Sequence, residues 1–170
     1  GEIISADSMQ VYRHMDIGSA KIRPEEMQGV PHHLVDCLEP DEEFNVVRFQ
    51  QMAKEAMKGI YDRGRIPVLV GGTGFYIQAV TGDIDFTVHG EDTTYRQMLE
   101  EKAKTEGAQV LHEMLAAVDP ASAAAIHANN VKRVIRALEY YRQTGKPISQ
   151  HNEEQRQKES PYNLAYFVLN

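Results

Sequence analysis

Two short apolar runs in the first half of the chain stop abruptly at small polar residues. One covers residues 2–7 and ends at Asp7, and the other covers residues 66–70 and is followed by Gly-Gly-Thr-Gly at 71–74. Short apolar runs bounded in this way predict buried strands. Residues 34–38 form a third, shorter apolar run, and we expect a strand there as well.

A helical repeat separates these predicted strands. Apolar side chains recur three or four positions apart after Asn45, at Phe49, Met52, Ala53, Ala56, Met57 and Ile60. This spacing predicts a helix with one buried face, with Asn45 as its N-cap and Gly64 just past its end. A further helix is expected to start after Gly74. Strand, helix and strand in this order predict a βαβ unit, so we expect an α/β fold with a parallel sheet.

The pattern changes near residue 83. From Asp92 to Thr144 there is no strand-like run, and the spacing predicts helices at about 92–106, 108–118, 120–127 and 130–143. The polar stretch 147–161 is expected to be a linker, and the apolar run 163–170 a strand that returns to the sheet. The predicted organisation is therefore an α/β core at 1–84, a helical insertion at 85–150, and a linker with a return strand at 151–170.

The composition limits the partners and the cellular locations that we expect. The chain has 170 residues with 25 acidic and 18 basic side chains, and its net charge of −7 argues against a surface that coats nucleic acid broadly. The single cysteine, Cys37, is interpreted as a core residue, and a reducing cytoplasm is the expected location. No run approaches the ~20 apolar residues of a membrane span. Because the chain starts without Met and ends inside an apolar run, we expect it to be part of a longer protein.

The two strand ends carry the candidate chemistry. Ligands of open parallel sheets bind at the carboxyl ends of the strands, so Asp7 and Thr73 are expected to share one site. A carboxylate there can bind a phosphate-linked metal or accept a proton, and a turn or cap aspartate is the alternative. Gly71 and Gly72 would let backbone N–H groups approach an anion, whereas a tight turn would need the same glycines. The loop lacks the Gly-Lys-Ser/Thr of a Walker A motif.

Other polar positions give weaker signals. Lys21 shares a loop with Asp16 and Gly18 and could hold a phosphate, although its spacing alone favours a solvated lysine. His32 and His33 are adjacent and would point in different directions on a strand. A third ligand at useful spacing is lacking, so a histidine metal site is not expected.

A basic cluster lies within the last predicted helix of the insertion and just after it. Residues 131–146 contain five basic side chains and one acidic side chain, in a chain whose total charge is negative: Lys132, Arg133, Arg136, Arg142, Lys146 and Glu139. A concentrated patch of this kind favours a phosphate-rich partner. A solvated helix face is the alternative.

Five segments, in order along nearly the whole chain, resemble bacterial tRNA dimethylallyltransferases (tRNA isopentenyltransferases). They are ISADSMQVY at 4–12, MDIGSAK at 15–21, PHHLVD at 31–36, VGGTGFY at 70–76 and KRVIRALE at 132–139. The resemblance implies a P-loop NTPase-like α/β core with an inserted helical domain. It also implies transfer of a dimethylallyl group from dimethylallyl diphosphate to N6 of adenosine 37 in tRNA, beside the anticodon, by a monomeric enzyme that uses Mg²⁺.

The same resemblance assigns roles to residues. Asp7 and Thr73 are implied to be catalytic, with Asp7 as the general base at N6 and the protein ligand of the metal. Gly71, Gly72 and Lys21 are expected to bind the diphosphate. The tRNA-contacting set comprises Asp7, Ser8, Met9, Gln10, Thr73, Arg96, Lys132, Arg133, Val134, Ile135 and Arg136.

The chain also departs from the family pattern. The family's Gly-x-x-x-x-Gly-Lys-Ser/Thr loop, about twenty residues before the position of Asp7, lies outside this sequence, as does the C-terminal region. Ser19 stands where the family usually has threonine. Two alternatives therefore remain at this point: a small-molecule kinase of the P-loop class, which would use ATP, and a non-catalytic RNA-binding fragment.

Overall fold

The computed structural model describes residues 1–86 and 93–168, and these residues form two compact units. One unit comprises Gly1–Ile84 with Glu159–Asn170, and the other comprises Asp85–Lys158. The position expected for the start of the first insertion helix, Asp92, lies outside the described residues, as do residues 169 and 170. None of the described helices has the length and apolar character needed to cross a bilayer.

The first unit contains the parallel sheet that the sequence predicts. β1 (Glu2–Ser5) lies between β2 (His32–His33) and β3 (Pro67–Val70), and both pairings are parallel. β1 and β3 are in register over their whole length, with Ile4 opposite Leu69. The α/β class with a parallel sheet is therefore confirmed.

The second strand along the chain, β2, lies at a different position from the one predicted. We expected it at 34–38, but the structure forms it at His32–His33. Leu34 and Asp36 have positive φ angles of 62° and 50°, which are incompatible with extended backbone. Beyond that point the segment forms no strand, and one isolated bridge joins Leu38 to Tyr12. The apolar run therefore turns rather than continuing the strand.

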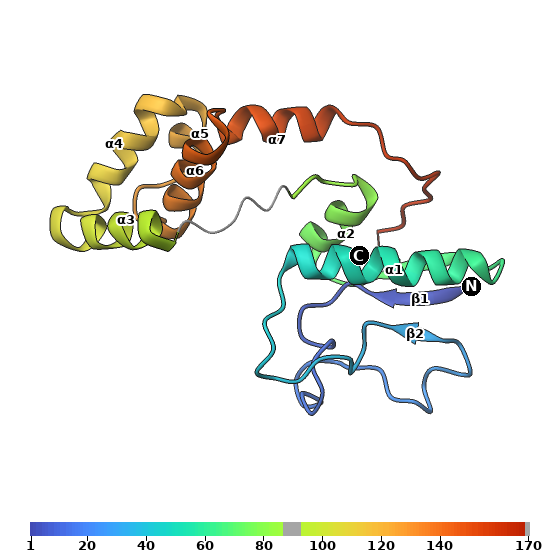
Figure 1. Cartoon of the computed structure of the whole chain (residues 1–170). Helices are drawn as coiled ribbons and strands as arrows, with labels where there is room; N and C mark the ends of the chain where they lie inside the picture. Colours follow the sequence, from blue (N-terminus) through green and yellow to red (C-terminus); the bar gives the residue numbers. More distant parts are fainter. Residues whose placement is uncertain (87–92, 169–170) are drawn as a thin grey trace. The chain divides into compact units, whose positions relative to one another are not determined.

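One face of the sheet is covered by α1 (Val46–Asp62), and α1 in turn packs against α2 (Gly74–Thr81) (Figure 1). The N-cap prediction is confirmed, because the Asn45 side chain accepts hydrogen bonds from the backbone N–H groups of Val47 and Arg48. Phe49 of α1 stacks on Tyr76 of α2 with ring centroids 4.6 Å apart. These contacts fix α2, and with it the loop after β3, against α1.

The start of β1 is held by a buried ionic cluster. The side chain of Glu2 is 1 % exposed and accepts hydrogen bonds from Arg63, Arg65 and His33. The hydrogen bonds from Arg63 and His33 lower the pKa of Glu2 to about 2. This cluster lies at the amino end of the strand, opposite the end that leads to Asp7.

The second unit is helical, as the sequence predicts. α3 (Thr93–Glu106), α4 (Ala108–Val118), α5 (Pro120–Ala125) and α6 (Val131–Thr144) lie close to their expected ranges. Their core consists of Leu99, Leu111, Leu115, Ala123, Val134, Ile135, Ala137 and Leu138. Asp119 caps α5 through the backbone N–H of Ser122. This unit therefore has a core of its own.

Two expectations for the C-terminal part are wrong. Residues 148–157 form helix α7 (Ile148–Gln157) instead of a linker, and Asp119 docks its first turn by accepting hydrogen bonds from the backbone N–H and hydroxyl of Ser149. The return strand is absent over 163–168, the part of that run the structure describes. Its apolar side chains there are solvent-exposed, and no ladder hydrogen bond joins this segment to the sheet.

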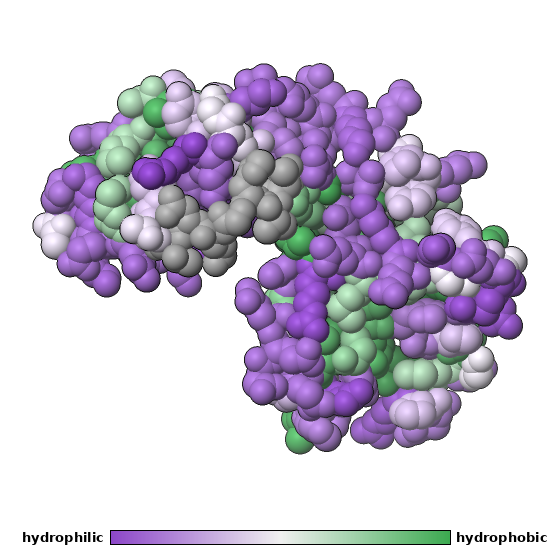
Figure 2. Space-filling model, in the orientation of Figure 1, coloured by the Kyte–Doolittle hydropathy of each residue, from purple (hydrophilic) through white to green (hydrophobic). Residues whose placement is uncertain are grey.

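The surface of the first unit keeps some large apolar side chains exposed. Ile66, Val68 and Val70 along the β3 segment are 72 %, 44 % and 50 % exposed. Figure 2 shows hydrophobic patches interrupted by hydrophilic side chains on the visible face. β3 is thus an apolar edge of the sheet in the described part of the chain.

Candidate active site

The structure brings Asp7 and Thr73 to the same edge of the sheet. Asp7 follows β1 and Thr73 follows β3, and the two strands are neighbours. The backbone contacts continue past the strands, because Ala6 N–H donates to Val70 O at 2.7 Å and Thr73 N–H donates to Ala6 O at 3.3 Å. The two candidate catalytic residues therefore sit beside each other along the carboxyl edge, where ligands of parallel sheets bind.

This close approach depends on Gly71. A Cβ atom at residue 71 would lie 2.3 Å from the carbonyl oxygen of Ala6 and 2.5 Å from its carbonyl carbon. Gly72 is different, because a Cβ atom there would meet nothing within 4 Å. The first glycine is thus required by packing, whereas the second leaves open space in front of the backbone.

The carboxylate of Asp7 is oriented by the backbone that follows it. Its Oδ1 accepts hydrogen bonds from Met9 N–H at 2.7 Å and from Gln10 N–H at 3.1 Å. These bonds turn the chain after Ser5, so β1 is shorter than predicted. They engage one carboxylate oxygen and leave Oδ2 available to a substrate. Burial, followed by the charges of Tyr12 and Asp7, raises the pKa of Tyr76.

Gln10 has a structural role that the sequence did not indicate. Its Oε1 accepts from Ser5 Oγ at 3.2 Å, and its Nε2 donates to the carbonyl oxygens of Ser19 and Ala20 at 3.4 and 3.1 Å. The amide is therefore engaged within the protein and supports the turn that orients Asp7. Ser8, which we expected to contact adenosine with Asp7, Met9 and Gln10, is partly buried, whereas Met9 is exposed.

A pocket of about 320 Å³ opens beside these residues. Its lining combines the carboxyl ends of the strands with the loops that follow them: Ile3, Ser5, Asp7, Gln10, Ile22, His32, Val35, Val70, Gly71 and Gly72. Asp7, Gly71 and Gly72 all face it, as expected if these residues share one site. Thr73 lies next to this lining in sequence but is not part of it.

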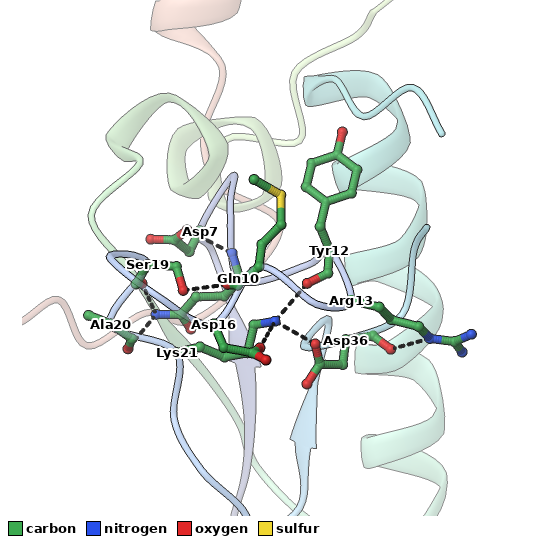
Figure 3. A network of polar contacts seen from close by, with 10 residues as sticks. Asp7, Gln10, Tyr12, Arg13, Asp16, Ser19, Ala20, Lys21 and Asp36 are labelled. Atoms are coloured by element: carbon green, nitrogen blue, oxygen red, sulfur yellow. Dashed lines mark hydrogen bonds and ion pairs between the residues drawn. The ribbon is translucent and has the colours of Figure 1, made fainter. Parts of the chain in front are cut away.

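Lys21 does not occupy the position expected of a diphosphate ligand. Its ammonium group donates to Tyr12 O at 2.7 Å, Asp16 Oδ1 at 2.8 Å and Asp36 Oδ1 at 2.5 Å, and the side chain is 5 % exposed (Figure 3). Burial acts to lower its pKa, but the hydrogen bonds to Asp16 and Asp36 outweigh burial and raise the pKa above its ordinary value. The three ammonium hydrogens therefore have three acceptors inside the protein.

The described residues contain no cluster of three or more histidine, cysteine and carboxylate side chains that would hold a metal ion by itself. His33 pairs with Glu2, and His32 Nδ1 lies 2.8 Å from Val30 O. Among the described residues, Asp7 is the one carboxylate that lines the pocket at this edge of the sheet. That fits Mg²⁺, which is usually held by one or two carboxylates together with substrate phosphates and water.

In the helical unit, the basic segment divides into two faces. Lys132, Arg133 and Arg136 are exposed on α6. Val134 and Ile135 are 0 % and 3 % exposed, and their side chains belong to the core of this unit, so contact with tRNA at these two positions stays a prediction. The physical reason for their burial is the helical repeat, which turns these two positions toward α3 and α4.

Arg96, the remaining expected tRNA contact, forms a bidentate ion pair. Its guanidinium donates to both carboxylate oxygens of Glu139 at 3.0 and 2.9 Å. This pair joins α3 to α6 within the helical unit. Contact between Arg96 and RNA stays a prediction.

Comparisons with known proteins agree with this arrangement. The family profile described as IPP transferase matches residues 10–170. A tRNA dimethylallyltransferase of Lachnoclostridium phytofermentans is 68 % identical over 170 residues, covering all of this chain and 54 % of the relative. The chain thus spans about half the length of the curated relatives it matches.

Solved structures give the same result. A tRNA isopentenylpyrophosphate transferase from Bacillus halodurans is 53 % identical, with a TM-score of 0.53 over 86 % of this chain and 48 % of that protein. A eukaryotic dimethylallyltransferase, described as acting on tRNA, is 32 % identical, with a TM-score of 0.75 over 94 % of this chain and 39 % of that protein. These matches favour the transferase interpretation over a small-molecule kinase. The chain belongs to the IPP transferase family.

Proposed function

We propose that the protein containing this chain transfers a dimethylallyl group from dimethylallyl diphosphate to N6 of adenosine 37 in tRNA, next to the anticodon. The observation that carries this proposal is the meeting of Asp7 and Thr73 at one edge of the sheet, beside a pocket lined by Gly71 and Gly72. Membership of the family and the names of its relatives support the same reaction.

The residues at this edge suit the chemistry. An adenine N6 is a weak nucleophile because its lone pair is delocalised into the ring. Asp7 Oδ2 accepts the N6 proton as the new C–N bond forms, while Oδ1 remains bound to Met9 and Gln10 N–H and keeps the carboxylate oriented. Thr73 contacts the substrate beside Asp7 through its hydroxyl. A base in a single-stranded loop can leave its stack at low cost and reach such an edge.

The diphosphate leaves from the opposite side of the transferred carbon, and its charge must be neutralised. The open space in front of Gly72 allows phosphate oxygens to approach the backbone there. Mg²⁺, when bound, would supply further positive charge to the diphosphate; Asp7 Oδ2 could hold it only in place of taking the N6 proton, and the Mg²⁺ dependence described below separates these two roles. The exposed Lys132, Arg133 and Arg136 contact phosphates of the anticodon stem-loop.

The variant that tests this proposal is Asp7→Asn in the full-length protein. Asparagine keeps an Oδ1 acceptor for Met9 and Gln10 N–H but cannot take the proton, so turnover should fall by roughly 10²- to 10⁴-fold. Transfer of labelled dimethylallyl to tRNA measures turnover, and a filter-binding assay measures tRNA affinity, which should stay unchanged. Asp41→Asn, at an exposed position of the same unit, is the control.

The same pair of variants separates the two roles assigned to Asp7. If Asp7 holds the metal, the Mg²⁺ concentration that gives half-maximal activity should rise in Asp7→Asn. If it serves as the base alone, turnover falls while the Mg²⁺ requirement stays that of the wild type. Wild-type turnover in Asp7→Asn would remove Asp7 from the mechanism.

A further inference from the structure

Lys21 is a buried cation that is neutralised by two largely exposed carboxylates. Its side chain is 5 % exposed, whereas those of Asp16 and Asp36 are 69 % and 49 % exposed. A solvated loop lysine would lose nothing by staying in water, and burying an ammonium group is costly unless its hydrogen-bonding capacity is met. Here the three donors have Tyr12 O, Asp16 and Asp36 as acceptors. Lys21 therefore acts as a buried link between three parts of the chain, and we call this side chain with its three acceptors the anchor.

The three acceptors come from separate segments of the first unit. Tyr12 lies in the turn after β1, Asp16 in the loop that contains Lys21, and Asp36 in the turn after β2. The segments after β1 and β2 are also joined directly, by backbone hydrogen bonds from Asp36 N–H to Gln10 O and from Cys37 N–H to Val11 O and by Arg13, which donates to Asp36 O at 3.0 Å. Lys21 adds to these contacts by tying its own loop to both segments (Figure 3).

The backbone around this point is strained. Ala20 and Asp36 have φ angles of 49° and 50°, and His14, in the same loop region, has a φ of 64°. Non-glycine residues hold such angles only where surrounding contacts enforce them. Lys21 follows Ala20 directly in the sequence, and its ammonium group binds a carboxylate oxygen of Asp36. Its hydrogen bonds are therefore among the contacts that enforce the backbone at both residues.

A continuous set of hydrogen bonds leads from this loop to Asp7. The carbonyl oxygens of Ser19 and Ala20, immediately before Lys21, accept from the Gln10 side-chain amide. The backbone N–H of the same Gln10 donates to Asp7 Oδ1. Displacing the loop would therefore displace Gln10 and change the direction of the Asp7 carboxylate.

We propose that Lys21 is a positioning residue of the transferase reaction: by binding Tyr12 O, Asp16 and Asp36 together, it locks the 16–21 loop on Gln10 and so fixes the orientation of Asp7. This inference rests on the proposed function, and it assigns Lys21 no contact with either substrate. It also explains why a lysine that sequence spacing would leave in solvent is buried.

The test uses Lys21→Met in the full-length protein. Methionine keeps much of the apolar stem, and the exposed Asp16 and Asp36 can be solvated after the lysine is lost, so folding should be preserved. We expect kcat to fall by roughly 10- to 100-fold, because a small misorientation of a reacting group has this effect. KM for dimethylallyl diphosphate and KM for tRNA should each stay within about threefold, since the anchor touches neither substrate.

Lys54→Met is the matched control. Lys54 forms an ion pair with Asp83 in the same unit, away from the pocket, and its removal should leave kcat within about twofold of the wild type. If Lys21→Met matches Lys54→Met in kcat, the anchor is refuted while the transferase activity stands. If the wild-type protein transfers no dimethylallyl group, the proposed function itself is refuted.

Two further outcomes would overturn the positioning role of Lys21. A selective rise in KM for dimethylallyl diphosphate in Lys21→Met would identify a diphosphate ligand and overturn the positioning role. If Lys21→Met does not fold, Gln10→Glu replaces it: the glutamate would face the carbonyl oxygens of Ser19 and Ala20 without a donor, and the same loss of kcat at constant KM is expected. Wild-type kcat in Gln10→Glu would overturn the proposal.

Discussion

Gly71 offers a sharp test of how the site is assembled. Substituting alanine would place a Cβ atom 2.3 Å from the carbonyl oxygen of Ala6, whereas ordinary van der Waals contact begins at 3.4 Å. The obstacle is backbone rather than a flexible side chain, so β1 and β3 would have to separate by about 1 Å at the edge that carries Asp7 and Thr73. Overpacking of this kind costs about 1–3 kcal/mol in the free energy of unfolding.

The effect on activity should be larger than the effect on stability implies. A displacement of about 1 Å between a general base and its substrate lowers turnover by roughly 10²-fold. We therefore expect Gly71→Ala in the full-length protein to lose that much kcat at temperatures where it is still folded. Turnover is measured by transfer of labelled dimethylallyl to tRNA, and the free energy of unfolding by urea titration.

Gly72→Ala is the matched comparison, because the two glycines are adjacent and differ in what surrounds them. A Cβ atom at residue 72 would meet no protein atom within 4 Å, so stability should change by less than about 0.5 kcal/mol. If phosphate oxygens approach the backbone there, Gly72→Ala should raise KM for dimethylallyl diphosphate. Equal stability and equal kcat for Gly71→Ala and the wild type would refute the argument that this glycine sets the separation of the strands.

Two further predictions concern charge. The pKa of Glu2 is about 2, against an ordinary value of 4.5, so the stability that this carboxylate provides is fully present above pH 4.5 and is lost as the pH falls from 4.5 toward 2. The melting temperatures of Glu2→Gln and of the wild type should therefore converge over that range. Melting temperatures that stay parallel would contradict this reasoning. In the helical unit, Lys132→Ala and Arg136→Ala should each weaken tRNA binding and reduce the slope of log K against log salt by about one, while Lys104→Ala on α3 leaves the slope unchanged. Equal slopes for all three variants would show that the α6 residues do not contact phosphates.

The elements that the sequence predicts well are those whose own residues determine them. α4 begins and ends at the expected residues because Gly107, with a φ of 93°, and Asp119 mark its limits locally. The apolar repeat of α1 likewise identifies the face that packs on the sheet. α7 is the opposite case. It buries no residue, so its sequence has no apolar repeat that would predict a helix. Its start is held by Asp119, which lies thirty residues before its partner Ser149 in the sequence.

The same distinction applies to the site. Asp7 and Thr73 could be placed together from sequence because both follow a strand, and the carboxyl ends of parallel strands share an edge. The role of Lys21 could not be predicted, since its partner Asp36 is fifteen residues away and approaches only through the turn after β2. Likewise, the basic run at 132–136 predicts a charged segment, but only packing against α3 and α4 separates exposed Arg133 from buried Val134.

The segment at residues 2–7 carries a carboxylate at each end, and their surroundings show which one is suited to chemistry. Glu2 is buried among Arg63, Arg65 and His33, and with a pKa near 2 it binds protons too weakly to serve as a base at neutral pH. Among the described residues, Asp7 forms no ion pair and is held by backbone N–H groups on one oxygen. A carboxylate saturated by cations stabilises the fold, whereas one that is oriented but not neutralised retains a lone pair for a proton. The carboxylate at the amino end of β1 is thus engaged in stabilising the fold, whereas Asp7 keeps an oxygen free for the proton transfer that we propose.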